Sequence, residues 1–290
     1  MKVVSTFEDL RHQRAELPGP LGLVPTMGYL HAGHMSLVQA ACQANASVAV
    51  SIFVNPTQFG PQEDLGSYPR DLPRDLALLE EAGVDLVWTP TPESMYPADY
   101  QTWVEVEYLT LPLEGARRPG HFRGVATVVA KLFNAVQPDR VYFGQKDAQQ
   151  AAVIRRMAAD LNYPLEIVIC PIVREPDGLA LSSRNSYLNP EERQAATVLY
   201  RALGAAVEAY ARGVRGASEL RSLMMSVLQQ EPLAAVQYVS VADPDSLVEI
   251  EGDVNRGLFS MAVYFGKTRL IDNMLVGVNP VGSSPQSGHI

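Results

Sequence analysis

Short apolar runs alternate with helical patterns through the first two thirds of the 290-residue chain, and this alternation constrains the fold more than any other feature. In residues 124–136, for example, valine, leucine and phenylalanine recur along one helical face. Strands that alternate with helices lie parallel, because each helix returns the chain to the same edge of the sheet. The pattern therefore predicts an α/β fold with a doubly wound parallel sheet. Strands are expected at residues 21–24, 47–54, 84–88, 140–143 and 165–169, and helices at 35–45, 72–82, 124–136 and 148–162.

The pattern changes after Asn189. This residue and Pro190 indicate a helix start, because Asn caps a first turn and Pro suits its first position. Two helices followed by strands indicate a small C-terminal α+β domain, which we place at residues 186–280 after a ligand-binding domain at 1–185. The polar residues 281–290 are expected to form a disordered tail. The expected elements are helices at 190–212 and 217–230 and strands at 235–241, 257–265 and 268–271.

Charge and composition exclude several classes of partner. The net charge of −9 and the pI near 5.1 argue against a nucleic-acid partner or an anionic membrane surface. No apolar run is long enough to span a membrane, and the first residues lack the long apolar stretch that is typical of a signal peptide. Cys42 and Cys170 lie in apolar surroundings, as expected of buried thiols in a reducing compartment. A cytoplasmic protein is expected.

The segment His31-Ala32-Gly33-His34 follows an expected strand and opens an expected helix. A helix N-terminus carries unpaired N–H groups and partial positive charge, so it attracts anions, and two imidazole N–H donors would add to it. Gly28 and Gly33 would allow a ligand to approach the backbone closely. The segment fits a triphosphate site, although two histidines can equally be structural. A metal site lacks a third ligand nearby in the sequence.

Two side-chain amides follow the next expected strand. Asn55 and Gln58 could bind the hydroxyl and carboxylate oxygens of a small substrate, since amides both donate and accept. The alternative is a simple Asn-Pro turn. Because ligands bind outside the carboxyl ends of parallel strands, we expect these amides to share one site with the histidine segment.

A lysine and an aspartate follow the expected strand at 140–143. Lys146 could meet a phosphate oxygen, and Asp147 could cap the helix that begins next. Gln149 and Gln150 point in different directions from the first turn, so only one of them is expected to face a cleft. The alternative is a capped helix with a surface lysine.

Cationic and hydroxyl side chains gather in two further loops. Residues 117–124 hold three arginines and one histidine, which suit phosphates or a carboxylate on a mobile lid, or else form a solvated loop. Ser182, Ser183 and Arg184 lie at the proposed domain junction, where clefts are common. They could bind phosphate, or form only a linker turn.

Together these segments resemble the pantothenate synthetase (pantoate–β-alanine ligase) family of the His-x-Gly-His nucleotidylyltransferase superfamily. The resemblance rests on residues 25–34, 53–59, 144–150, 181–185 and 268–273, in matching order and spacing, and covers residues 1 to about 278. It implies a Rossmann-like sheet, a homodimer and an AMP-forming ligase of pantothenate and coenzyme A biosynthesis. ATP and Mg²⁺ would activate pantoate as pantoyl adenylate with release of pyrophosphate, and β-alanine would then displace AMP.

The resemblance also implies roles for individual residues. His34 corresponds to the catalytic histidine, Gln58 would contact pantoate and β-alanine, and Gln150 would contact pantoate. Position 145 is Gln where many relatives carry Glu, which would change nucleotide or metal handling only if side-chain charge matters there. The protein ligands of the metal are not implied. The residues expected to bind ATP are Met27, Gly28, Tyr29, Leu30, His31, Ala32, Gly33, His34, Gly144, Gln145, Lys146, Asp147, Val173, Leu181, Ser182, Ser183 and Arg184.

The chemistry of such a ligase places demands on these residues. Pantoate is ionised at neutral pH, since carboxylate pKa values lie at about 4, so its attack on ATP needs no general base. Because two anions must meet, positioning and cationic stabilisation should dominate, and we expect His34, Lys146 and Arg184 to supply that stabilisation. Three other functions share part of the pattern: a nucleotidylyltransferase acting on a mononucleotide, a tRNA-charging enzyme and a non-catalytic nucleotide sensor.

Overall fold

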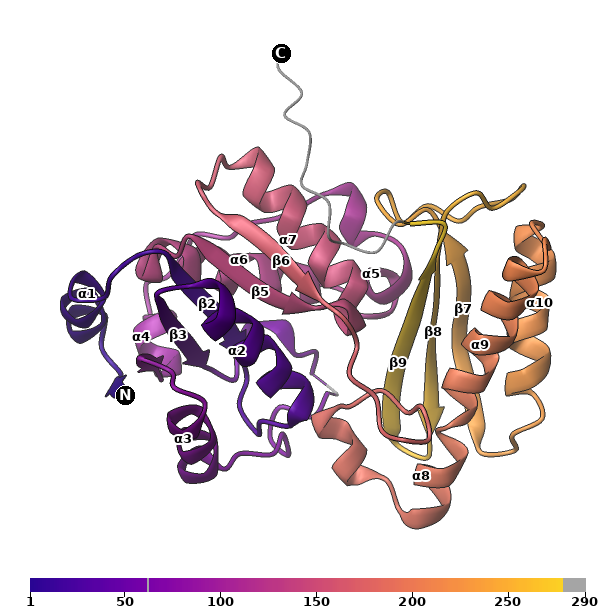
Figure 1. The fold of residues 1–290 in the computed structure, drawn as a ribbon, viewed down its shortest axis with the longest axis horizontal. Helices are drawn as coiled ribbons and strands as arrows, with labels where there is room; N and C mark the ends of the chain where they lie inside the picture. Colours follow the sequence, from indigo (N-terminus) through magenta and orange to yellow (C-terminus); the bar gives the residue numbers. More distant parts are fainter. Residues whose placement is uncertain (62, 279–290) are drawn as a thin grey trace.

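A six-stranded parallel sheet forms the larger part of the fold in the computed structural model, which describes residues 1–61 and 63–278. Its strand order is β1-β4-β3-β2-β5-β6, which confirms the predicted doubly wound sheet, and Figure 1 labels its strands β3, β2, β5 and β6. The chain runs from β2 outward through β3 to β4, and later from β5 to β6 on the other side. The order therefore reverses between β2 and β5, where a crevice opens at the carboxyl ends of the strands. The strands are β1 (Lys2–Val4), β2 (Leu21–Thr26), β3 (Ser47–Ile52), β4 (Leu86–Trp88), β5 (Arg140–Gly144) and β6 (Glu166–Cys170).

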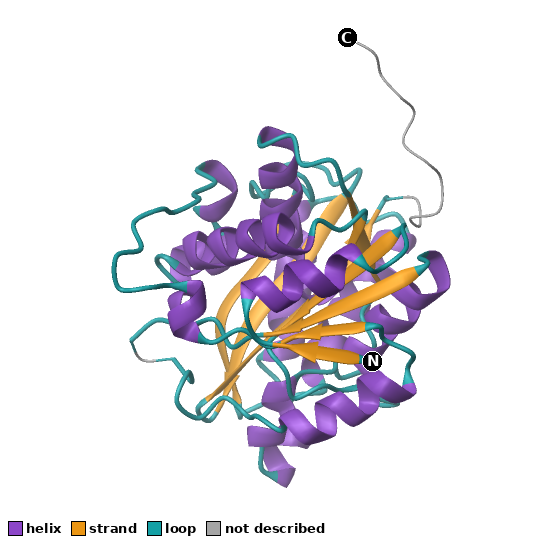
Figure 2. Ribbon diagram, turned by 90° about the vertical axis from the view of Figure 1, so that its left-hand side faces the viewer, coloured by secondary structure: helices purple, strands orange, loops and turns teal. Residues whose placement is uncertain are grey.

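Neighbouring residues of the central strands pack against different helix layers. Leu21 and Leu23 belong to a cluster with α1, α6 and α7, whereas Val24 packs with α2 and α3. Successive strand side chains point to opposite faces, so a sheet covered on both sides needs continuous apolar runs. Figure 2 shows the strands between their helices. The helices are α1 (Phe7–Ala15), α2 (Ala32–Ala44), α3 (Leu72–Glu81), α4 (Pro92–Met95), α5 (Leu113–Arg117), α6 (His121–Val136) and α7 (Ala148–Asp160), with 3-10 turns η1 (Pro56–Gln58), η2 (Tyr108–Thr110), η3 (Gln145–Asp147) and η4 (Ser183–Tyr187).

The second sheet is antiparallel and is formed by β7 (Ala234–Ala242), β8 (Gly257–Phe265) and β9 (Thr268–Val276), in that order. Helices α9 (Val198–Ala211) and α10 (Ala217–Leu228) cover the side facing away from the parallel sheet (Figure 1). Phe259 and Met261, two residues apart on β8, pack in one cluster with these helices. The domain division at residues 185 and 186 stays a prediction, and the expected tail at 281–290 lies outside the described residues.

The single helix expected over residues 190–212 is wrong in detail. Helix α8 (Pro190–Ala195) ends before α9 begins at Val198. Between them the Thr197 hydroxyl donates to the oxygen of Gln194 at 2.8 Å, and the Thr197 N–H donates to the same oxygen at 3.2 Å. A hydroxyl bound to the preceding turn competes with the helical pattern, and bonds spanning three residues tighten the backbone.

Strand β9 continues to Val276, beyond residue 271, where the sequence predicts its end. Polar contacts connect the additional residues to segments that follow the strands of the parallel sheet. Asp272 is 1% exposed and accepts hydrogen bonds from Arg174 at 2.6 and 2.9 Å. The side-chain amide of Asn273 donates to the main-chain oxygens of Gln145 at 3.1 Å and Lys146 at 2.9 Å. Buried polar groups are tolerated where their hydrogen bonds are made, so these residues can continue the strand.

The elements at the N-terminus escape sequence patterns because they are short or polar. β1 pairs with β4 over three residues, and Leu10 is the buried residue of α1. In the part of the chain that the structure describes, no helix is both long enough and apolar enough to cross a bilayer. Cys170 is buried, as expected, whereas Cys42 is half-buried, and both thiols are free.

Candidate active site

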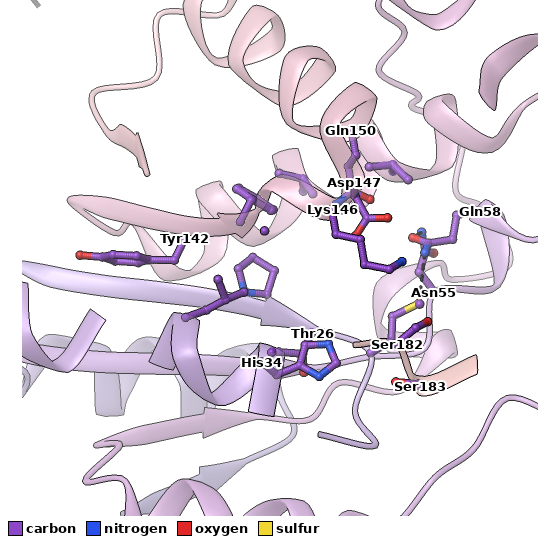
Figure 3. A pocket seen from close by; sticks show the side chains of 18 of the residues that line it. Thr26, His34, Asn55, Gln58, Tyr142, Lys146, Asp147, Gln150, Ser182 and Ser183 are labelled. Carbon is purple, nitrogen blue, oxygen red and sulfur yellow. Dashed lines mark hydrogen bonds between the residues drawn. The ribbon is translucent and has the colours of Figure 1, made fainter. Parts of the chain in front are cut away.

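A cavity of about 240 Å³ lies at the carboxyl ends of β2, β3 and β5, where the strand order reverses (Figure 3). Each polar segment singled out in the sequence contributes to its wall. The predicted site residues that line it are Met27, His31, Gly33, His34, Gln58, Gly144, Lys146, Asp147, Gln150, Val173, Leu181, Ser182, Ser183 and Arg184. The other predicted residues, Gly28, Tyr29, Leu30, Ala32 and Gln145, belong to the same segments but are not part of the lining.

The two histidines of the histidine segment form the N-terminus of α2, which begins earlier than expected, at Ala32. The Nδ1 atom of His31 accepts the N–H of Gly33 at 3.1 Å, and Nδ1 of His34 accepts the N–H of His31 at 3.4 Å. The rings stack with their centroids 4.0 Å apart. A Cβ at residue 33 would lie 2.9 Å from the His31 ring, so glycine is required for this arrangement. The histidines therefore bind two of the N–H groups at this end of the helix, those of His31 and Gly33.

Both imidazoles are neutral at pH 7. Burial lowers the pKa of His31 to about 4, and burial together with the neighbouring His31 and Lys146 lowers the pKa of His34 to about 3. Because each Nδ1 accepts a hydrogen bond, the proton of each neutral ring lies on Nε2. In this structure the ring of His34 is therefore a neutral N–H donor, and its expected part in stabilising the phosphate charge stays a prediction.

A buried carboxylate, Asp75 on α3, shapes the turn that precedes α2. It is 1% exposed and accepts the N–H groups of Tyr29 and Leu30, both at 2.7 Å. These two backbone donors therefore face Asp75. The sequence interpretation missed this residue, yet a signal was present: Asp75 lies one turn before the buried Leu79, on the apolar side of the helix, where a charge requires partners.

The two amides after β3 have different surroundings. Asn55 is 1% exposed, and its Nδ2 donates to Gln58 Oε1 at 3.1 Å while its Oδ1 accepts from Tyr96 and Thr57. The Nε2 atom of Gln58 lies 3.1 Å from the sulfur of Met27. Asn55 is thus committed to the protein and orients Gln58, which lines the cavity and remains partly exposed.

The segment after β5 presents Lys146 and Gln150 to the cavity, and the Lys146 side chain points into it in Figure 3. Gln149 turns away, because its side chain is buried and binds the N–H of Glu114 at 2.9 Å. Asp147 occupies the N-cap position of α7 but makes no capping hydrogen bond, so that part of the prediction is wrong.

The side chain of Gln145 faces β9 instead of the cavity. Its Nε2 donates to Oδ1 of Asn273 at 3.1 Å, and its main-chain oxygen accepts from the same amide. A carboxylate at this position would therefore meet Asn273 on β9 before it met a ligand in the cavity.

The η4 turn brings two serines and an arginine to the cavity from the side of the second sheet. Ser182 caps the turn by accepting the N–H of Arg184 at 3.3 Å, and Ser183 is buried. The Arg184 guanidinium binds both oxygens of Asp64, at 2.8 and 3.0 Å. This arginine thus faces the cavity while held by a carboxylate of the protein.

The arginines of residues 117–124 do not converge. Arg117 is exposed, Arg118 binds both oxygens of Glu63 at 2.7 Å, and Arg123 lies over the ring of Trp103. Of the three, Arg118 lines the cavity, together with His121 at the start of α6. The three arginines therefore do not form a cationic cluster over the cavity, and the one that lines it is held in an ion pair.

The chain matches the family model described as pantoate-beta-alanine ligase over residues 2–275. It is 62% identical to the pantothenate synthetase of Roseiflexus sp. (strain RS-1) over 276 residues, which cover 95% of this chain and 99% of that protein. Its fold is similar to the crystal structure of pantothenate synthetase from Thermus thermophilus, with a TM-score of 0.91, 51% identity, and coverage of 94% of this chain and 99% of that one. A pantoate-beta-alanine ligase from Francisella tularensis, complexed with beta-gamma ATP and beta-alanine, has a TM-score of 0.78 and 35% identity over 95% of this chain and 97% of that one.

Proposed function

The chain belongs to the pantoate–β-alanine ligase family, and on this premise we propose how its cavity carries out the ATP-dependent condensation of pantoate with β-alanine to give pantothenate, AMP and pyrophosphate. The observation that carries the proposal is the meeting of a helix N-terminus, an oriented amide and a lysine in one cavity. The family match over residues 2–275 favours this activity over a mononucleotide transferase, a tRNA-charging enzyme or a nucleotide sensor.

In the first step, a carboxylate oxygen of pantoate forms a bond to the α-phosphorus of ATP, and the bond to pyrophosphate breaks. The product is pantoyl adenylate. The nucleophile is already ionised, so the protein must hold two anions together while charge builds on the α-phosphate. Gln58 and Gln150 are assigned to pantoate, because both amides line the cavity and can bind hydroxyl and carboxylate oxygens.

Stabilisation of the phosphate charge is assigned to three groups with different electrostatics. Lys146 contributes a compact positive charge inside the cavity. Arg184 contributes a second charge once the phosphates compete successfully with Asp64. His34 contributes a neutral Nε2–H donor at the N-terminus of α2, where the helix dipole also favours anions. Ser182 and Ser183 add hydroxyl groups from the η4 segment, which lines the same cavity.

In the second step, the amine of β-alanine attacks the carbonyl carbon of the adenylate. A C–N bond forms, the bond to AMP breaks with its electron pair on the phosphate oxygen, and the nitrogen releases its extra proton to water. From the family resemblance, Gln58 is assigned to β-alanine as well as pantoate, and Asn55 and Met27 hold its side chain at the cavity. If one amide holds both the adenylate and β-alanine, the attack of the amine becomes effectively unimolecular.

Magnesium, the homodimer and a cytoplasmic location are proposed from the family resemblance. Mg²⁺ is bound in proteins through one or two carboxylates, phosphate oxygens and water. Asp147 fits that role, because it lines the cavity and its carboxylate makes no capping bond. When bound with ATP, the ion would neutralise phosphate charge. Within the described residues no group of three or more His, Cys, Asp or Glu side chains could hold a metal alone, so the nucleotide would complete its shell.

The proposal is tested by isotope exchange and product analysis. Labelled pyrophosphate should enter ATP when pantoate and Mg²⁺ are present, without β-alanine, because the first step is reversible. Pantothenate and AMP should form in equal amounts only after β-alanine is added. Exchange that does not depend on pantoate, or consumption of ATP without pantothenate, would exclude the assigned reaction. A crystal soaked with ATP and pantoate would place the substrates against Gln58 and Lys146.

A further inference from the structure

His121, at the start of α6, connects Gln58 to an ion pair. Its Nδ1 atom lies 2.8 Å from the main-chain oxygen of Gln58, and its Nε2 atom lies 3.0 Å from Nη1 of Arg118. Arg118 binds both carboxylate oxygens of Glu63 at 2.7 Å. The reaction steps above leave these three side chains without a role, although two of them line the cavity.

The partners of the His121 ring determine where its proton lies. A carbonyl oxygen only accepts hydrogen bonds, so Nδ1 carries the hydrogen and donates to Gln58. A guanidinium only donates, so Nε2 accepts from Arg118. A second proton on the ring would place an N–H group against the arginine. Burial, followed by the charge of Arg118, lowers the pKa of His121 to about 4, which keeps this single arrangement at neutral pH.

The start of α6 is also packed unusually close to the turn that carries Gln58. A Cβ on Gly124 would collide with the main-chain oxygen of Thr57 and lie 2.8 Å from the nitrogen of Gln58, so only glycine allows this approach. Asn55 Nδ2 adds a hydrogen bond to the oxygen of Gly124 at 3.2 Å. The position of η1 is therefore set by the first turn of α6.

We propose that His121 is a positioning residue for the condensation: its Nδ1–H holds the main chain of Gln58 against α6, so that the Gln58 amide faces bound pantoate. Arg118 and Glu63 act behind it by fixing the ring in the orientation that donates. The inference rests on the role proposed above for Gln58. It predicts that losing the bond to Gln58 weakens pantoate binding while the ATP side of the cavity is left in place.

Two conservative substitutions separate the two bonds of the ring. In His121→Asn, the amide nitrogen takes the place of Nδ1 and can still donate to Gln58, but the bond to Arg118 is lost. In His121→Gln, the amide oxygen takes the place of Nε2 and can still accept from Arg118, but the bond to Gln58 is lost. His121→Ala removes both. His12→Gln, at an exposed histidine of α1, is the matched control.

The readout is the KM for pantoate and the KM for ATP in pyrophosphate exchange, measured on variants whose thermal unfolding matches the wild type. His121→Gln and His121→Ala should raise the KM for pantoate about tenfold, as expected for one lost hydrogen bond, and change the KM for ATP less than about twofold. Both KM values of His121→Asn should stay close to those of the wild type, because the bond to Gln58 is kept. Equal damage in the Asn and Gln variants, or a rise confined to ATP, would overturn the proposal.

A double-mutant cycle with Gln58→Ala gives a second measurement that does not depend on any single variant. If His121 acts through the Gln58 side chain, His121→Gln should have little further effect once that side chain is absent. If His121→Gln instead damages the structure in general, it should raise the KM for pantoate by the same factor in the wild type and in Gln58→Ala. That result would refute a positioning role. A wild-type protein without pantoate-dependent exchange would refute the proposed function itself, before the variants are compared.

Discussion

Asp64→Asn is expected to tighten ATP binding. Asp64 and Arg184 form a two-point ion pair, and their side chains are 21% and 29% exposed. Because Arg184 lines the cavity, a triphosphate must draw this guanidinium away from its carboxylate partner. An ion pair with this exposure is worth about 1 kcal/mol. Asparagine keeps the shape and removes the charge, so the Kd for ATP should fall about fivefold.

Calorimetric titration of ATP, without pantoate, measures this change directly. Asp160→Asn is the matched control, since Asp160 pairs with Arg156 along the surface of α7. Salt screens exposed charges, so the difference between the wild type and Asp64→Asn should narrow as ionic strength rises. If Asp64→Asn binds ATP no more tightly than the wild type at low salt, Arg184 is not held back by Asp64 and the reasoning is wrong.

Three further outcomes are expected. Lys146→Ala should slow pantoate-dependent pyrophosphate exchange by about 100-fold, as for other lost donors at a developing charge, and near-normal exchange would reject the role of this lysine. Asp75→Ala should lower the free energy of unfolding in urea by about 3 kcal/mol, because the part-buried N–H of Tyr29 and the buried N–H of Leu30 lose a charged acceptor; a change below about 1 kcal/mol would contradict this. The pKa of His121 is about 4 in the folded protein and 6.5 for an unperturbed histidine, so the unfolded chain binds more protons between these values. The free energy of unfolding should therefore fall as pH drops from 7 towards 4, and its slope against pH should be shallower in His121→Asn. Identical slopes in the two proteins would show that His121 does not contribute to the pH dependence.

Much of the fold could be predicted because it depends on local periodicity. Continuous apolar runs such as that around Leu23 are required wherever both faces of a strand are covered, and they leave a signal in the sequence. The grouping of polar segments into one cavity also followed, since parallel strands place their carboxyl ends at one edge. β1 gave no such signal, because three residues cannot display a period.

The electrostatic state of the site could not be predicted, because it depends on contacts between distant residues. Nothing near His34 in the sequence shows that burial keeps its ring neutral. Likewise, Arg184 and Asp64 are 120 residues apart, so their ion pair has no local signature. The roles of His34, Lys146 and Arg184 therefore stay predictions, and the structure changes only the charge that we assign to His34.

The main-chain position of Lys146 depends on both sheets. Asn273 on β9 binds the main-chain oxygens of Gln145 and Lys146, the two peptides from which the lysine side chain extends. Asn273 does not itself line the cavity. A residue of the antiparallel sheet that lies outside the cavity wall therefore helps to fix the main chain from which the Lys146 side chain extends.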